Sequence, residues 1–240
     1  METGKKRKTY RILLLDVDGT LLDFNESERQ GISKLLETYG FPVLEEYISQ
    51  YHDINEQFWQ KFNRGEIEKS QLLTARFEQF FRQLGREING TEAEEYYRNF
   101  LDQSAILIPE AVETCRYLSQ KYACYIVTNG TSSTQYKRLA LSGLDQFVKR
   151  IFVSEDAGSQ KPQKSYFDYC FSWIFPDRKE IGEKEKGQIL IIGDSLHSDI
   201  LGGNYAGIDT CWVNPKNQPG EEGIHADYEI SQISDLLTFL

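Results

Sequence analysis

The sequence has few of the residues that build thiolate or imidazole metal sites. Among 240 residues it has four cysteines and three histidines, and no two cysteines form a Cys-x-x-Cys pair. A zinc site is therefore not expected, and the cysteines, which lie among apolar residues, are expected to be buried free thiols. They are Cys115, Cys124, Cys170 and Cys211.

Long apolar runs and positive charge are also scarce. No run is long enough to cross a membrane, and the basic run at 5–8 precedes no signal-peptide core, so we expect a cytoplasmic protein without a membrane partner. Lysine and arginine number 27 against 37 acidic residues, a net charge of −10. Nucleic acid polymers are bound mainly through lysine and arginine, so they are not expected as partners, although a local site for one small phosphate is compatible with this charge. The oligomeric state is left open.

Short apolar runs, many of them β-branched, recur in the first and last parts of the chain. They are continuous rather than alternating, as is typical of strands covered on both faces. Helical patterns lie between them, one opening with Pro109 and another ending at Gly143. This alternation predicts the α/β class, with a parallel sheet between two layers of helices. The predicted strands are 10–15, 124–128, 150–154, 188–193 and 210–214.

The stretch from 25 to 105 interrupts this rhythm, because it contains no convincing strand. Apolar residues recur at helical spacing in 44–62 and 71–85. An amphipathic helix must bury its apolar face, so we interpret the aromatic stripes as a packing seam rather than a cofactor site. The sequence therefore predicts an all-helical insert, 25–105, in an α/β core formed by 1–24 and 106–240.

Four carboxylates follow two of the predicted strands, at the ends where open α/β sheets bind ligands. Asp16 and Asp18 come directly after the first strand, and Asp194 and Asp199 follow the strand at 188–193. Close carboxylates repel one another, so a hard cation with oxygen ligands is expected, and Mg²⁺ is the common choice beside phosphate. We predict Asp16 and Asp194 as direct metal ligands, with Asp199 acting through water or by holding a lysine.

The same strand ends predict phosphoryl transfer. Asp16 can attack phosphorus to form an aspartyl-phosphate, and Asp18 can protonate the leaving alcohol and then deprotonate the attacking water. The Thr128 hydroxyl and the Asn129 backbone N–H can hold phosphoryl oxygens, while Lys161 and the metal stabilise their charge. Each motif alone is an ordinary turn or loop, but their order, each at a strand end, favours one shared site.

The ordered set D-x-D-G-T, T-N-G, K-P and G-D-x-x-x-x-D resembles the haloacid dehalogenase-like hydrolase superfamily over essentially the whole chain. The resemblance implies a Rossmann-like core with a helical cap inserted after the first strand. It also implies the roles given above, with Mg²⁺ coordination completed by the backbone carbonyl of Asp18. Dehalogenase members lack the second aspartate and need no metal, so Asp18 points to a phosphatase. The sequence departs from the family at Gln160, where small apolar residues usually precede the lysine.

Three further segments, 58–81, 198–214 and 223–236, are similar to bacterial pyrimidine-type 5′-nucleotidases of this superfamily. The implied activity is Mg²⁺-dependent hydrolysis of a small phosphomonoester, a nucleoside 5′-monophosphate with a pyrimidine base preferred. Phe24, soon after the catalytic turn, is a candidate contact for that base. The sequence leaves open a sugar-phosphate or phosphoglycolate phosphatase, a phosphomutase, and a non-catalytic phosphate-binding or phosphoacceptor protein.

The three histidines are not expected to act as bases, because Asp18 already supplies acid–base function. His197 lies inside the G-D-x-x-x-x-D motif and is predicted as a loop or rim residue. His52 and His225 have polar surroundings and are expected to be solvated.

Overall fold

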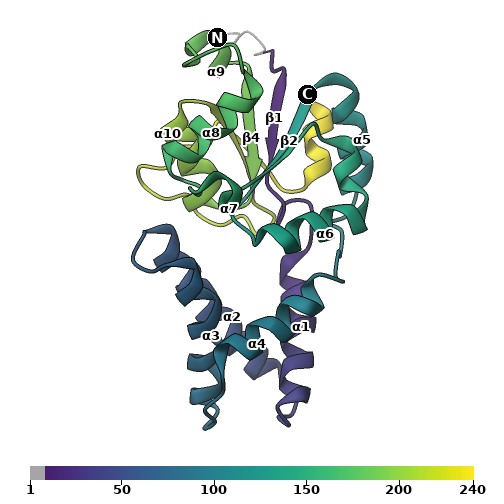
Figure 1. Ribbon diagram of the computed structural model, residues 1–240. Helices are drawn as coiled ribbons and strands as arrows, with labels where there is room; N and C mark the ends of the chain where they lie inside the picture. Colours follow the sequence, from purple (N-terminus) through teal and green to yellow (C-terminus); the bar gives the residue numbers. More distant parts are fainter. Residues whose placement is uncertain (1–8) are drawn as a thin grey trace. The chain divides into compact units, whose positions relative to one another are not determined.

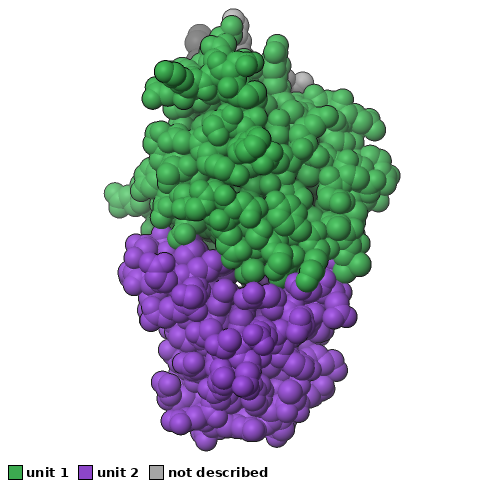
Figure 2. All heavy atoms as spheres, in the orientation of Figure 1, with its two compact units in different colours: residues 1–22, 107–240 green, residues 23–106 purple. Residues whose placement is uncertain are grey.

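The computed structural model describes residues 9–240, so the basic run at 5–8 lies outside the described residues. The chain divides into two compact units, which Figure 2 colours separately. One contains the described residues up to 22 together with 107–240, and the other contains residues 23–106. The first unit is α/β and the second is helical.

The α/β unit is built on one six-stranded sheet in which all neighbouring strands are parallel. The strand order is β3-β2-β1-β4-β5-β6, so the first strand of the chain lies at the centre. The predicted fold class is confirmed, and the last strand was not predicted because it is a short segment of a polar tail. The strands are β1 (Ile12–Leu15), β2 (Ala123–Thr128), β3 (Ile151–Val153), β4 (Ile189–Gly193), β5 (Asp209–Val213) and β6 (Tyr228–Ile230).

Side chains along β1 alternate between two apolar cores. Leu13 and Leu15 belong to the core covered by α5, α6 and the C-terminal turn η3, whereas Ile12 and Leu14 belong to the core covered by α8 and α10 (Figure 1). Because both faces are covered, the strand is apolar throughout. The helical elements of this unit are α5 (Ala111–Lys121), α6 (Ser132–Ser142), η1 (Leu144–Phe147), α7 (Ser154–Ala157), α8 (Lys164–Ile174), α9 (Glu183–Lys186), η2 (Leu196–Ile200), α10 (Leu201–Ala206) and η3 (Ile233–Thr238).

The helical unit is held together by its aromatic residues. The rings of Tyr51 and Phe77 stack with centroids 5.4 Å apart, and both rings contact Tyr97. The aromatic stripes are therefore a packing seam, since their large apolar surfaces are removed from water inside the unit. The helices are α1 (Phe24–Thr38), α2 (Glu45–Asn63), α3 (Lys69–Gln83) and α4 (Gly90–Leu101).

A chain of polar side chains also runs through the helical unit. Glu28 lies 2.6 Å from His52 Nδ1 and accepts a hydrogen bond from Asn55 at 2.5 Å. Arg76 donates to Asn55 at 2.7 Å and pairs with Glu94 at 2.6 Å. Each buried charge thus has a partner, as burial requires. The side chain of His52 is 41% exposed, so it is partly solvated as expected, but its ring also contacts the buried Glu28.

All four cysteines are buried and free. Burial raises the pKa of each thiol to about 12, so the thiols stay protonated and unreactive at neutral pH. Within residues 9–240, no helix has the length and apolar character needed to span a membrane.

Candidate active site

The strand order creates a switch point at the carboxyl ends of β1 and β4. From β1 the chain first builds β2 and β3 on one side, and later adds β4 on the other. Open α/β sheets bind ligands where the order reverses in this way. Asp16 follows β1 and Asp194 follows β4, and the Asp16 N–H donates to the carbonyl of Ile192 at 2.9 Å. The sheet register therefore sets the two aspartates side by side.

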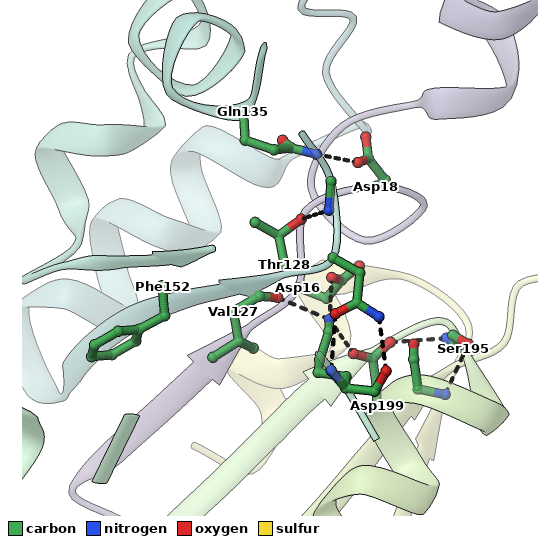
Figure 3. A network of polar contacts seen from close by, with 12 residues as sticks. Asp16, Asp18, Val127, Thr128, Gln135, Phe152, Ser195 and Asp199 are labelled. Carbon is green, nitrogen blue, oxygen red and sulfur yellow. Dashed lines mark hydrogen bonds and ion pairs between the residues drawn. The ribbon is translucent and has the colours of Figure 1, made fainter. Parts of the chain in front are cut away.

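The ammonium of Lys161 has three acceptors, and Figure 3 labels the residues that supply them, Asp16, Asp199 and Val127. Its ammonium donates to Asp16 at 2.6 Å, to Asp199 at 2.6 Å and to the carbonyl of Val127 at 2.9 Å. Burial disfavours the charge of this lysine, which is only 1% exposed, but the two carboxylates outweigh burial and raise the pKa of Lys161. The site therefore contains a permanent positive charge.

Asp199 is fully buried, and both of its carboxylate oxygens have partners. Oδ1 accepts from Lys161, and Oδ2 accepts from the backbone N–H of Ser195 at 3.1 Å. The residue lies in the π-helical turn η2, and Gly193 leaves room for it, because a Cβ there would be 2.2 Å from Asp199 Cγ. Asp199 therefore holds Lys161 directly, one of the two arrangements expected from the sequence.

Asp194 differs, because no residue within 9–240 donates a hydrogen bond to its carboxylate. Its backbone carbonyl accepts from the Trp212 indole at 2.8 Å. Burial, followed by the charges of Asp16 and Asp199, raises the pKa of Asp194 well above its usual value. The backbone of Gly19, which has φ +84°, lies close to the Asp194 carboxylate. A Cβ at Gly19 would be 2.2 Å from Asp194 Oδ2, so this turn requires glycine.

A divalent cation fits these donors. Carboxylate oxygens of Asp16, Asp194 and Asp199 all lie within 4.8 Å of one another. Burial raises the pKa of Asp16 despite Lys161, and Asp199 raises it further, so additional positive charge would favour the ionised form. Oxygen-only ligands suit a hard cation such as Mg²⁺.

The T-N-G segment, which begins at the last residue of β2, positions groups around the lysine. The Thr128 side-chain oxygen accepts a hydrogen bond from the Gly130 N–H at 3.1 Å, so the hydroxyl proton can still be donated to a ligand. The Asn129 carboxamide is bonded to the backbone of Lys161. The sequence had suggested the Asn129 backbone N–H as a phosphate donor, but the role of its side chain was missed.

Asp18 makes its contacts outside the lysine-centred network. Oδ1 accepts from Arg138 and Oδ2 from Gln135, each at 2.5 Å, and Figure 3 shows the contact with Gln135. The two donors are three residues apart on α6, so they share one face of the helix. Neither donor belongs to the motifs predicted from the sequence, although two polar residues on the helix face that carries Leu139 were an available signal.

Two other residues considered from the sequence, Phe24 and His197, make different contacts. Phe24 is the first residue of α1 and packs against the apolar core of the helical unit. Its contact with substrate stays a prediction. His197 is half exposed and lies 3.1 Å from the carboxylate of Glu221. Neither residue contributes to the hydrogen bonds around Lys161.

The chain is similar in sequence and in structure to known proteins. The sequence profile of the haloacid dehalogenase-like hydrolase family matches residues 10–207. The chain is similar to the HAD-hydrolase YfnB of Bacillus subtilis, with 42% identity over 97% of this chain and 96% of YfnB. The crystal structure of YfnB bound to magnesium matches with a TM-score of 0.89 over 97% of this chain and 99% of that one. Two pyrimidine 5′-nucleotidases are also similar, PynA of Streptococcus pneumoniae (33% identity, 96% and 95% coverage) and YjjG of Escherichia coli (29% identity, 93% and 95% coverage).

Proposed function

Because the chain belongs to the haloacid dehalogenase-like hydrolases, we propose that it is a Mg²⁺-dependent phosphomonoesterase that works through an aspartyl-phosphate on Asp16. One observation carries this proposal. One oxygen of Asp16 is bound to Lys161 at 2.6 Å, and the other accepts no hydrogen bond from residues 9–240. A carboxylate oxygen held vacant beside a permanent positive charge is suited to nucleophilic attack.

In the first step, the vacant oxygen of Asp16 attacks phosphorus and the bond from phosphorus to the ester oxygen breaks. Asp18, in its protonated form, gives its proton to the leaving oxygen, so that the alcohol departs neutral. The protons of Lys161 are already engaged, so this residue stabilises the phosphoryl group by its charge, and the Thr128 hydroxyl donates to a phosphoryl oxygen. The products are phosphorylated Asp16 and the free alcohol.

In the second step, water attacks the phosphorus of phosphorylated Asp16. Asp18, now ionised, takes a proton from the water as the bond between phosphorus and Asp16 breaks. Inorganic phosphate is released, and both aspartates return to their starting protonation. Mg²⁺, held by Asp16, Asp194 and the backbone carbonyl of Asp18, would supply charge neutralisation for the phosphoryl oxygens.

We assign pyrimidine nucleoside 5′-monophosphates as the substrate class. The residues named above address only the phosphoryl group, so they treat all phosphomonoesters alike. The preference for a nucleotide is supported by the similarity to PynA and YjjG, which extends over 96% and 93% of this chain.

A kinetic panel tests the assignment. The purified protein with Mg²⁺ is assayed for phosphate release from UMP, dUMP, dTMP, AMP, phosphoglycolate and glucose 6-phosphate. The highest kcat/KM is expected for a pyrimidine nucleotide. A preference of about tenfold or more for phosphoglycolate or a sugar phosphate, ~1.4 kcal/mol in transition-state binding, would refute the nucleotidase assignment and leave the phosphatase mechanism standing. Absence of phosphate release from every ester would refute both.

A further inference from the structure

The Asp18 carboxylate is held by two donors that the catalytic motifs do not include. Arg138 Nη1 donates to Oδ1 and Gln135 Nε2 donates to Oδ2, each at 2.5 Å. An arginine contact to a carboxylate is charge-assisted and stronger than a neutral hydrogen bond. With one donor on each oxygen, the plane of the carboxylate is defined as well as its position.

The two donors are buried, although the group that they hold is not. The side chain of Arg138 is 1% exposed and that of Asp18 is 28% exposed. A buried guanidinium is costly unless a partner offsets its charge. The partner of Arg138 is Asp18, the carboxylate that transfers the proton in the proposed mechanism. The buried arginine therefore contacts a reacting group.

The surroundings of Gln135 are shaped to the same contact. A Cβ on Gly130 would lie 2.0 Å from Gln135 Nε2, so the glycine of the T-N-G segment is what lets this side chain reach Asp18. The helix that carries both donors is anchored at its start, since Ser132 and Tyr136 each donate to Asp156 at 2.9 Å. The donors therefore extend from a fixed helix.

We propose that Arg138 and Gln135 are positioning residues, which set the side-chain conformation from which Asp18 transfers its proton. This inference rests on the proposed function and deepens it. Each carboxylate oxygen has a second lone pair, so Asp18 can carry a proton towards the leaving oxygen while both contacts persist. Arg138 acts as the main anchor because it is charged, and Gln135 sets the orientation of the second oxygen.

The test compares two esters that differ in their need for a proton. The leaving group of p-nitrophenyl phosphate departs readily as an anion, whereas the alkyl oxygen of UMP needs protonation. Arg138→Met is expected to lower kcat for UMP roughly 10- to 100-fold more than kcat for the aryl ester, as misplacement of a catalytic group predicts. Arg138→Lys should recover part of the loss. Lys137→Ala, an exposed cation on the same helix, should leave both rates unchanged.

A double-mutant cycle asks whether Arg138 acts through Asp18. In an Asp18→Asn background, Arg138→Met should lower the rate with the aryl ester by less than about threefold, because no positioned carboxylate is left to misplace. A large further loss in that background would overturn the proposal. An equal loss for both esters in the single variant would also overturn it, since that is the signature of general damage to the fold.

Gln135→Met covers the case in which the Arg138 variants do not fold, because it exchanges a neutral side chain for one of similar length. It is expected to show the same selective loss for UMP, and wild-type kinetics on both esters would overturn the proposal. Wild-type and Asp18→Asn enzymes are measured in parallel. A wild-type enzyme inactive on both esters would refute the proposed function and this inference with it. If the wild-type enzyme is active and neither Arg138→Met nor Gln135→Met shows a selective loss of kcat for UMP, only this inference is refuted and the proposed function stands.

Discussion

The side chain of Asn129 holds the backbone of Lys161 from both sides. The Lys161 N–H donates to Asn129 Oδ1 at 3.0 Å, and Asn129 Nδ2 donates to the Lys161 carbonyl at 2.9 Å. The first residue follows β2, and the second lies in the loop between α7 and α8. This reciprocal pair fixes the point from which the lysine side chain enters the buried site between Asp16 and Asp199.

Asn129→Ala is expected to lower kcat by roughly tenfold, because the lysine charge is no longer aligned with the nucleophile. Asn204 provides a matched control, since it makes the same reciprocal pair with the backbone of His225 at 2.8 and 2.9 Å. Asn204→Ala removes the same two hydrogen bonds and should leave kcat unchanged. Steady-state kinetics and thermal unfolding of both variants check this, and equal kcat losses would contradict the assignment.

Asp16→Asn keeps the shape of the nucleophile but removes its charge. Activity should fall by at least about 10³-fold, the scale seen when a nucleophile is lost, and no phosphoenzyme should be trapped by acid quenching. The wild-type phosphoenzyme should be cleaved by hydroxylamine, as an acyl phosphate is. Asp168→Asn, an exposed carboxylate paired with Lys164, is the control and should retain full activity. Turnover by Asp16→Asn near the wild-type rate would remove Asp16 from its role.

Chelation should abolish activity, and Mg²⁺ should restore it. Ca²⁺ should not replace Mg²⁺, because its longer and looser coordination misplaces the phosphoryl group. Mg²⁺ should also raise the unfolding temperature of the protein, since binding to the folded state stabilises it, and Asp194→Asn should weaken this effect. Full activity in excess EDTA would exclude the metal site.

The contact between His52 and Glu28 should make the stability of the protein depend on pH. The hydrogen bond with Glu28 raises the pKa of His52 above its ordinary value, so the folded state holds the proton more tightly than the unfolded chain. The resulting stabilisation is fully present below about pH 6.5 and is lost as the pH rises through the folded-state pKa.

His52→Gln removes this titration while retaining a hydrogen-bonding side chain. The difference in unfolding free energy between wild type and variant should be widest near pH 6 and shrink towards about pH 9, because the charged pair exists only at the lower pH. Urea unfolding across this range measures it. A difference that does not change with pH would show that the Glu28 contact does not favour the protonated ring.

The α/β class and the strand ends that carry the reactive groups follow from local patterns in the chain. The apolar run of β1 is buried on both faces, and Asp16 follows it directly, so both features depend on neighbours in the chain. The end of α6 is equally local, because Gly143 adopts the left-handed conformation, φ +71°, that terminates the helix. Periodicity and turn chemistry act over a few residues, so a linear sequence displays them.

The pairing of distant polar groups, in contrast, depends on how the chain packs. Asn129 and Lys161 are 32 residues apart, and Asp18 and Arg138 are 120 residues apart. In the sequence, Arg138 is one of two adjacent cations on α6, and its place beside Leu139 is only a weak sign that it is buried. It is buried against Asp18 because the crossovers and strand order bring α6 to the end of β1. A buried polar contact depends on packing between distant segments, and this relation is absent from the local pattern of either one.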